Sequence, residues 1–184
     1  MSARGEVTRA RLLEAGLDLL GEAGWPALTA RAVADRSGVN VGLIHYHFGG
    51  MSGLQEAVLA AAMDAIIGDL HRSVAEAGDP RSMVEAVRDG LASDRDSARM
   101  ARLSAVLLEG AARDPQIRAA LRQVLREARR QLSERLVEST SCPPRQAAAF
   151  ATLLMAASDG LLLHLAVDEE LAAEEAVELL LGLV

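Results

Sequence analysis

The stretch from Thr29 to Phe48, TARAVADRSGVNVGLIHYHF, constrains the fold of this chain more than any other feature. Gly38 divides it into two short pieces, and each piece carries apolar residues at the spacing of one helix face. These inward-facing positions are Val33, Ala34 and Ile44. Because a helix this short is unstable alone in water, each piece needs neighbouring elements to pack against it.

Three residues at the ends of these pieces mark where two helices begin and end. Thr29 can cap the first helix, and Gly38 can adopt the left-handed conformation that ends it. Asn40 can cap the second helix after a turn of about three to four residues. This arrangement predicts a helix-turn-helix, a unit whose second helix enters the major groove of DNA.

Glycine and proline divide the rest of the chain into further helices, each with an apolar face. Asp79 and Asp114, each followed by proline, can cap the helices that follow them. The predicted helices are about 8–23, 30–37, 41–47, 54–77, 80–92, 97–112, one that begins at Pro115, 147–167 and 172–184. The pattern predicts an all-α fold of about nine helices.

The run from Arg11 to Leu54 resembles the DNA-binding domain of TetR-type regulators. The matching elements are the first helix RLLEAGLDLLGEAGW, then T-x-x-x-V-A with S-G-V-N, and G-x-I-x-Y-H-F with a leucine six residues beyond the phenylalanine. The resemblance implies a three-helix helix-turn-helix domain at residues 1–53. A long helix would join it to an all-helical effector-binding and dimerisation domain at residues 54–184.

The same resemblance implies a function and a mechanism. Such a protein is expected to be a ligand-released repressor that binds a near-palindromic operator as a homodimer. Activation in place of repression stays open at this point. The residues predicted to contact DNA are Thr29, Arg31, Asn40, Val41, Gly42, Leu43, His45, Tyr46 and His47.

The residue types in the second helix predict how DNA would be read. Val41 and Leu43 offer only apolar contact, which suits a thymine methyl group, so direct base readout should be sparse. Gly42 costs about 1 kcal/mol of helix stability relative to alanine, which suggests that its backbone approaches DNA closely. The resemblance implies phosphate contacts for Thr29, Tyr46 and His47, with His45 in place of a more usual tyrosine.

One position departs from the family pattern. Family members usually carry lysine three residues after the phenylalanine, where this chain has Met51 in GGMSGL. Ser52 and Gln55 have the spacing of a capping box and predict that the next helix begins at about Leu54. The missing lysine leaves a second function open: a DNA-silent, all-helical dimeric protein that binds a small molecule or a protein partner.

Charge is distributed unevenly along the chain. Residues 1–55 carry five Arg and five acidic residues, whereas residues 56–184 carry fourteen Arg, twenty-one acidic residues and so the whole net charge of -7. An acidic protein is not expected to bind nucleic acid without sequence preference. The arginines near the N-terminus can reach a phosphate or the minor groove, or form a solvated segment; they are Arg4, Arg9 and Arg11.

The second domain is expected to hold a small aliphatic or amphipathic effector. Phe150 is the only aromatic residue beyond residue 55, so a site built on aromatic stacking is not expected. The predicted apolar lining is Met63, Met100, Leu103, Leu107, Phe150 and Met155, with Asp159 and His164 as polar candidates. Hydrogen-bonded core residues are the alternative interpretation of Asp159 and His164.

The apolar segment 147–167 is long enough to span a membrane, but Asp159 and His164 within it argue against insertion. A helix buried on several sides is the preferred interpretation. Its small residues, together with the leucine-rich C-terminus, predict a four-helix dimer interface. The predicted interface residues are Ala148, Ala151, Ala156, Gly160, Leu180 and Leu183.

Motifs of other classes of protein are not found. The chain has no Gly-rich phosphate loop, no H-E-x-x-H and no G-x-S-x-G, so neither an enzyme nor a cofactor is expected. His45 and His47 point roughly 200° apart on a helix, so a metal site is not expected either. The single cysteine, Cys142, cannot form an internal disulfide. The polar start, MSARGEVTRAR, has no signal-peptide pattern, which predicts a cytoplasmic protein.

Overall fold

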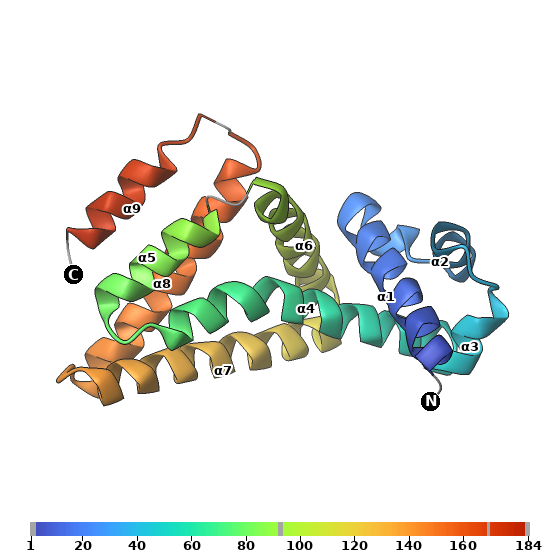
Figure 1. Cartoon of the computed structure of the whole chain (residues 1–184), viewed down its shortest axis with the longest axis horizontal. Helices are drawn as coiled ribbons and strands as arrows, with labels where there is room; N and C mark the ends of the chain where they lie inside the picture. The colour runs from blue at the N-terminus through green and yellow to red at the C-terminus, as the bar shows by residue number, and fades with distance from the viewer. Residues whose placement is uncertain (1–2, 92–93, 169, 183–184) are drawn as a thin grey trace. The chain divides into compact units, whose positions relative to one another are not determined.

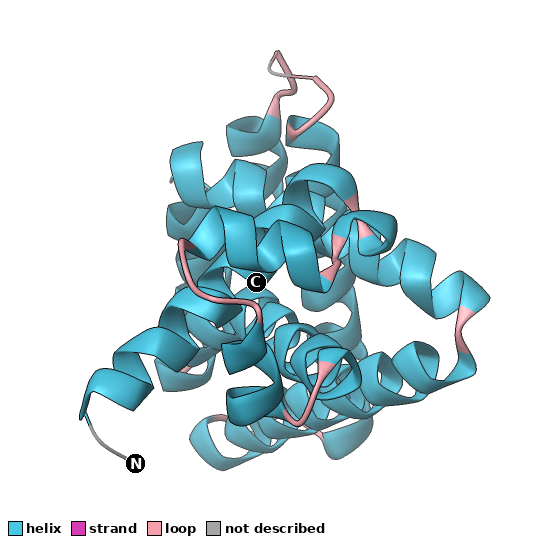
Figure 2. Ribbon diagram, turned by 90° about the vertical axis from the view of Figure 1, so that its right-hand side faces the viewer, coloured by secondary structure: helices cyan, strands magenta, loops and turns pink. Residues whose placement is uncertain are grey.

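The computed structural model describes residues 3–91, 94–168 and 170–182. Within these ranges the chain forms helices joined by short loops and no strand (Figure 2), so the predicted all-α fold is confirmed. Its helices are α1 (Ala3–Ala23), α2 (Ala30–Ser37), α3 (Gly42–Phe48), α4 (Met51–Glu76), α5 (Pro80–Leu91), α6 (Asp94–Arg113), α7 (Pro115–Ser139), α8 (Pro144–Leu165) and α9 (Ala173–Leu181), with a 3-10 helix, η1 (Trp25–Ala27), after α1 (Figure 1).

The chain divides into two compact units inside α4. We call residues 1–64 the head and residues 65–184 the body. The sequence placed the domain boundary at the start of this helix, between residues 53 and 54. The first turns of α4 thus belong to the compact unit that contains α1, α2 and α3.

The head is organised around a small apolar core, and α1 packs against α2 and η1. All four helices contribute fully buried side chains to it. They include Leu12, Leu20, Val33, Ile44, Leu54 and Val58. The helices α1 and α4 approach closely at Gly16, where a Cβ atom would lie 2.5 Å from Cγ2 of Val58. Glycine is therefore the residue that this helix crossing accommodates without rearrangement.

The helix α4 begins at Met51, so the predicted start at Leu54 and the capping box are wrong. Gly49 and Gly50 have φ of 73° and 121°, and these two left-handed residues make the whole turn between α3 and α4. The amide of Leu54 already donates to the carbonyl of Gly50 at 3.2 Å. Ser52 therefore lies inside the helix, where its side chain does not serve as an N-terminal cap.

The predicted aspartate caps of the body are confirmed. The amide of Ser82 donates to Oδ1 of Asp79 at 3.0 Å, and its hydroxyl donates to Oδ2 at 2.6 Å. These bonds to the hydroxyl and amide of Ser82 lower the pKa of Asp79. At the next break, the amide of Gln116 donates to Oδ1 of Asp114 at 2.7 Å. Arg118 then donates from Nε and from one terminal nitrogen to the carbonyls of Ala111 and Ala112, which closes the end of α6.

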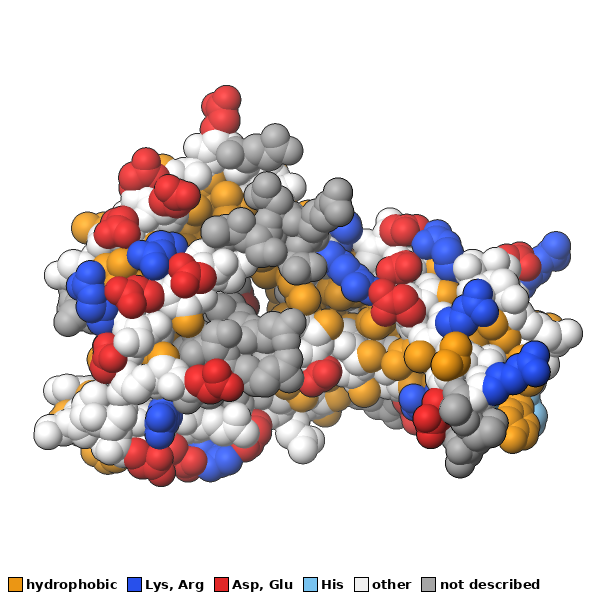
Figure 3. Space-filling model, in the orientation of Figure 1, with side chains coloured by type: hydrophobic (Ala, Val, Ile, Leu, Met, Phe, Trp, Pro, Cys, Tyr) orange, Lys and Arg blue, Asp and Glu red, His pale blue; other side chains and the backbone are white. Residues whose placement is uncertain are grey.

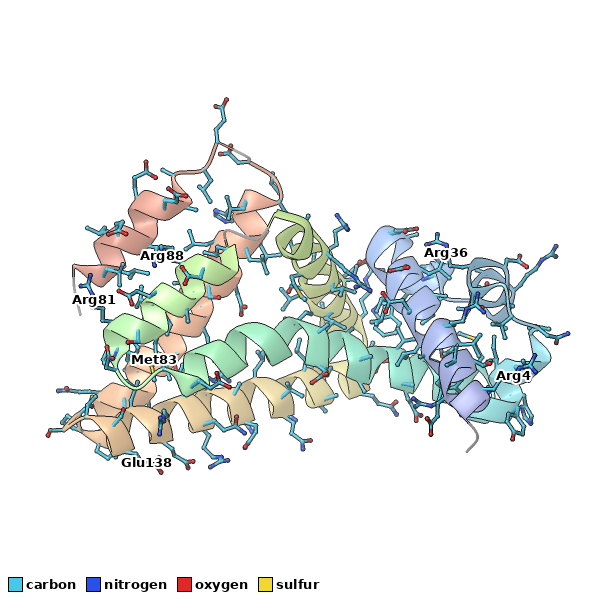
Figure 4. All side chains as sticks on the ribbon, viewed as in Figure 1. Arg4, Arg36, Arg81, Met83, Arg88 and Glu138 are labelled. Atoms are coloured by element: carbon cyan, nitrogen blue, oxygen red, sulfur yellow. The ribbon has the colours of Figure 1, made fainter. Side chains whose placement is uncertain are left out.

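The body has a second core, formed by α5, α7, α8 and α9 (Figure 1). Its fully buried side chains include Met83, labelled in Figure 4, Val84, Leu136, Ala147, Ala151 and Val177. The helix α9 packs against α5, α5 packs against α8, and α8 packs against α7. The helix α6 packs against α7 and α8, with Leu103 and Leu107 buried.

The helix α8 is the one described helix that is long and apolar enough to cross a membrane. It packs against α5, α6 and α7, and its inner residues join the second core. This packing supports the interpretation as a helix of the bundle. Only 22% of its apolar window is buried within the chain, however, so much of its surface is left uncovered.

Candidate nucleic-acid interface

The start of α2 is held by the cap that the sequence predicted. Thr29 is extended, and its hydroxyl oxygen accepts a hydrogen bond from the amide of Ala32 at 3.2 Å. Thr29 and Arg31 are both exposed at this end of the helix. Nε of Arg31 lies 3.8 Å from a carboxylate oxygen of Asp35, and both side chains are largely in solvent. Such a pair is weak, so it leaves the Arg31 guanidinium available to an anionic ligand.

The other end of α2 is tied to α1 by a two-pronged ion pair that the sequence analysis missed. The two terminal nitrogens of Arg36 (Figure 4) donate to the two carboxylate oxygens of Glu22 at 2.9 and 2.7 Å. These hydrogen bonds raise the pKa of Arg36. Arg36 therefore serves the packing of the head, although it is one of only five arginines near the predicted DNA-binding helices.

The turn between the two short helices matches the prediction closely. Gly38 has a left-handed φ of 64°, and Oδ1 of Asn40 accepts a hydrogen bond from the amide of Gly42 at 2.8 Å. The helix α3 starts at Gly42, one residue after the predicted start. A Cβ atom on Gly42 would lie 3.2 Å from Oδ1 of Asn40. The cap itself thus favours glycine here, which is a local reason beside the predicted close approach of DNA.

Three large apolar side chains around α3 point into solvent. Val41 is 52% exposed, Leu43 37% and Tyr46 76%, whereas Ile44 between them is 2% exposed and anchors the helix in the core. Figure 3 shows apolar surface beside arginine and histidine side chains at the right-hand end of the view. We call Val41, Leu43 and Tyr46 the reading surface. Exposed apolar side chains gathered on one short helix indicate a docking surface.

The two histidines of α3 have different surroundings. His45 is exposed, whereas His47 is half-buried, with its Nδ1 atom buried and lacking a hydrogen-bond partner in the described ranges. The ring of His47 makes edge contacts with Tyr46 at 4.9 Å and with Phe48 at 6.5 Å between centroids. Among the described residues, no group of three or more His, Cys, Asp or Glu side chains is placed to hold a metal ion.

The predicted effector residues occupy several environments. Met63 belongs to the head and the others to the body. Leu103, Leu107 and Met155 are buried, Met100 and Phe150 are half-buried, and Asp159 and His164 are exposed. Neighbouring protein atoms nevertheless desolvate Asp159 enough to raise its pKa, and Arg129 opposes that rise.

One polar group near the predicted pocket was missed by the sequence analysis. The Ser104 hydroxyl on α6 is buried without a hydrogen-bond partner among the described residues. It lies one residue after Leu103, which is fully buried.

The predicted dimer interface is only partly at the surface of the body. Ala148 and Ala156 are exposed, and Gly160 and Leu180 are half-buried. Ala151 is fully buried in the second core, so it has no surface to offer a partner and its prediction is corrected. Leu183 lies outside the described residues.

Two exposed leucines were missed by the sequence analysis. Leu153 on α8 and Leu179 on α9 are each 70% exposed. They are the largest uncovered apolar side chains of these two helices in the described ranges.

Comparisons with known proteins match both parts of the chain. Residues 12–58 match the family described as bacterial regulatory proteins, tetR family. Residues 77–173, more than half of the chain, match the C-terminal domain of LmrA/YxaF-like transcriptional regulators.

Individual relatives agree with these matches. The chain is 37% identical over 83 residues to the HTH-type transcriptional regulator BetI of Burkholderia lata, a match that covers 45% of this chain and 43% of that protein. The chain thus matches less than half the length of this curated relative.

Two solved structures are similar over nearly the whole chain. A transcriptional regulator from Rhodococcus sp. Rha1 is 28% identical, with a TM-score of 0.76 and coverage of 96% of this chain and 95% of that one. The multidrug binding protein EbrR complexed with malachite green is 25% identical, with a TM-score of 0.64 and coverage of 96% and 97%.

Proposed function

Because this chain belongs to the TetR family of bacterial transcriptional regulators, we propose that it is a ligand-released repressor that binds a near-palindromic operator as a homodimer. One observation supports this proposal most strongly. The reading surface of Val41, Leu43 and Tyr46 stands in solvent on a helix whose start is capped by Asn40. A monomeric protein with no ligand for α3 gains nothing from exposing these side chains.

The proposed interaction with DNA divides between bases and phosphates. Val41 and Leu43 would contact the edges of base pairs in the major groove, where they favour thymine methyl groups. Thr29, Arg31, Tyr46 and His47 would contact phosphates on either side, with Asn40 and His45 at the edges of the contact. Since Arg36 is paired with Glu22, few cations remain to attract DNA without sequence preference.

The proposed dimer is formed through the uncovered surface of α8 and α9. Leu153 and Leu179 are largely exposed, and Ala148, Ala156 and Gly160 beside them allow close approach of a second helix. Two-fold symmetry would place two copies of α3 at half-sites about 34–36 Å apart, or a multiple of that spacing. The operator would then repeat one half-site in inverted order.

Release would follow from a small effector bound within the body. The relative EbrR is a multidrug binding protein whose solved structure contains malachite green, and we extend the capacity for a small ligand to this chain. Aliphatic side chains and the orphaned Ser104 hydroxyl favour an amphipathic effector that offers one neutral hydrogen bond. The effector would act only through a higher affinity for the conformation that does not bind DNA. A cytoplasmic location follows from this function.

Selection of duplexes from a random pool by the purified full-length protein tests the proposal. Light scattering measures the oligomeric state of the same sample. The expected result is a dimer that selects one inverted repeat and releases it when the right small molecule is added. A protein that retains every duplex equally at moderate ionic strength contradicts it, and a monomer does so as well. A dimer that selects nothing at low salt would indicate the DNA-silent alternative.

A further inference from the structure

Arg9 of α1 lies against the last residue of α3. Its guanidinium carbon is 5.0 Å from the centroid of the Phe48 ring, within the range of a cation–π interaction. Both side chains are half-buried. The long side chain of Arg9 is thus held in one place beside the helix that carries the reading surface.

The charge of Arg9 is not neutralised within the described part of the chain. No carboxylate lies within ion-pair distance of it there, in contrast to Arg36, which is bound at both terminal nitrogens by Glu22. Arg31 has only its loose pair with Asp35 at 3.8 Å. Arg9 therefore differs from both: its position is fixed by an aromatic ring, and its charge remains free to bind an anion.

Stacking on an aromatic ring leaves the hydrogen-bonding capacity of arginine intact. The ring covers one face of the planar guanidinium, whereas the five N–H donors point outward in its plane. These donors match two oxygens of one phosphate group. Because the stack with Phe48 already restricts the side chain, less conformational entropy is lost when a phosphate binds.

Phe48 also connects Arg9 to the predicted phosphate-binding residues. Ring contacts run from Tyr46 to His47 at 4.9 Å and from His47 to Phe48 at 6.5 Å, and Arg9 extends this series from α1. We call Tyr46, His47, Phe48 and Arg9 the aromatic row. Arg4, labelled in Figure 4, lies at the same end of α1.

We propose that Arg9 is a phosphate-binding residue of the DNA-bound protein, placed by Phe48 next to the phosphates that Tyr46 and His47 contact. This proposal rests on the proposed function, since it assumes that α3 docks on a duplex. It adds a contact from α1 to those expected from α2 and α3. Arg9 binds the backbone and so contributes affinity and register, not base preference.

Binding of the selected inverted repeat by Arg9→Ala tests the proposal, with Arg11→Ala as the matched control. Arg11 carries the same charge and is exposed, but residues two apart on a helix point in nearly opposite directions. We expect Arg9→Ala to weaken binding about tenfold or more, because a charged hydrogen bond is lost in each protomer. The salt dependence of the logarithm of affinity should fall by about two, close to one per lost phosphate contact.

A double-mutant cycle with Phe48→Leu tests the role of the ring. The loss caused by Arg9→Ala should be clearly smaller in the Phe48→Leu background than in the wild-type protein, because the guanidinium is then no longer held in place. Equal losses in both backgrounds would contradict the positioning role. Circular dichroism and thermal unfolding verify that each variant keeps the fold.

The outcomes separate this inference from the proposed function. If the wild-type protein selects no duplex, the proposed function fails and Arg9 has no phosphate to bind. If the wild-type protein selects a repeat, but Arg9→Ala binds it with unchanged affinity and unchanged salt dependence, only the role of Arg9 fails. An equal effect of Arg11→Ala would show that net charge alone is responsible, which also overturns the proposal.

Discussion

The head and the body both leave large apolar side chains in solvent, but they support them differently. In the head, Val41, Leu43 and Tyr46 surround a helix of seven residues that is capped by Asn40 and closed by a left-handed Gly49. In the body, Leu153 lies on a helix of 22 residues that three other helices hold in place. The reading surface therefore depends on local turns, whereas the partner surface depends on how whole helices pack.

Glycine shows the same contrast between the two units. A Cβ atom on Gly53 in the head would overlap the backbone carbonyl oxygen of Phe48, and one on Gly16 would crowd Val58. Gly160 in the body has no atom within 4 Å of a Cβ atom at that position. The head thus uses glycine to bring its own helices together. Gly160 leaves space that only a second molecule could fill.

The largest expected effect comes from Gly53→Ala. The new methyl group would meet a backbone oxygen that no side-chain rotation can move, so the head should lose about 3 kcal/mol or more of stability. Hydrogen exchange measured by mass spectrometry should show faster exchange in α3 and the start of α4, and unchanged exchange in α7 and α8. The matched change in the body, Gly160→Ala, should leave the fold of one chain intact. Equal protection of α3 in both variants would contradict this contrast.

The next largest effect is expected from Leu153→Glu. A carboxylate on this 70% exposed side chain should leave the fold of one chain intact but oppose burial against a second copy. We expect monomers in light scattering and an operator affinity at least about a hundredfold lower, or about 2.7 kcal/mol. Val167→Glu is the control, because Val167 is 89% exposed beyond the end of α8. A Leu153→Glu protein that stays dimeric would exclude this surface as the interface.

A smaller effect is expected from removal of one helix cap in each unit. Thr29→Ala and Asp114→Ala each lose one hydrogen bond to a backbone amide and should cost about 1 kcal/mol. Only Thr29→Ala should also weaken operator binding, because α2 carries predicted phosphate contacts. Thermal unfolding and binding titrations measure the two quantities separately. Equal binding losses in both variants would mean that stability alone governs affinity.

The smallest effect concerns the pH dependence of the body. Burial among protein atoms raises the pKa of Asp159 above its usual 3.8, so its ionised form is less favourable in the folded chain than in the unfolded one. Stability is therefore lost as pH rises from the usual value through the raised one. Asp159→Asn should melt at a higher temperature than the wild-type protein at pH 7, and the two should converge at pH 3. A difference of the same size at both pH values would exclude this cause.

The helix-turn-helix was predictable because its signals are local. The cap at Thr29, the left-handed Gly38 and the hydrogen bond to Asn40 each depend on residues fewer than five positions apart. The start of α4 was not predicted correctly, since two adjacent glycines after Phe48 outweigh the capping-box pattern. For the same reason the role of Gly53 was missed: the atom that it must avoid belongs to the preceding helix.

The amino-acid sequence by itself determined the helical class, the breaks between helices and the residues of the two short helices, because spacing and end residues specify these within a few positions. Tertiary structure alone decided that Ala151 faces inward while Leu153 remains exposed, and that Arg36 is occupied by Glu22. It also decided that Arg9 lies on Phe48. These outcomes depend on which side of one helix meets another, and residues far apart in the chain set that geometry.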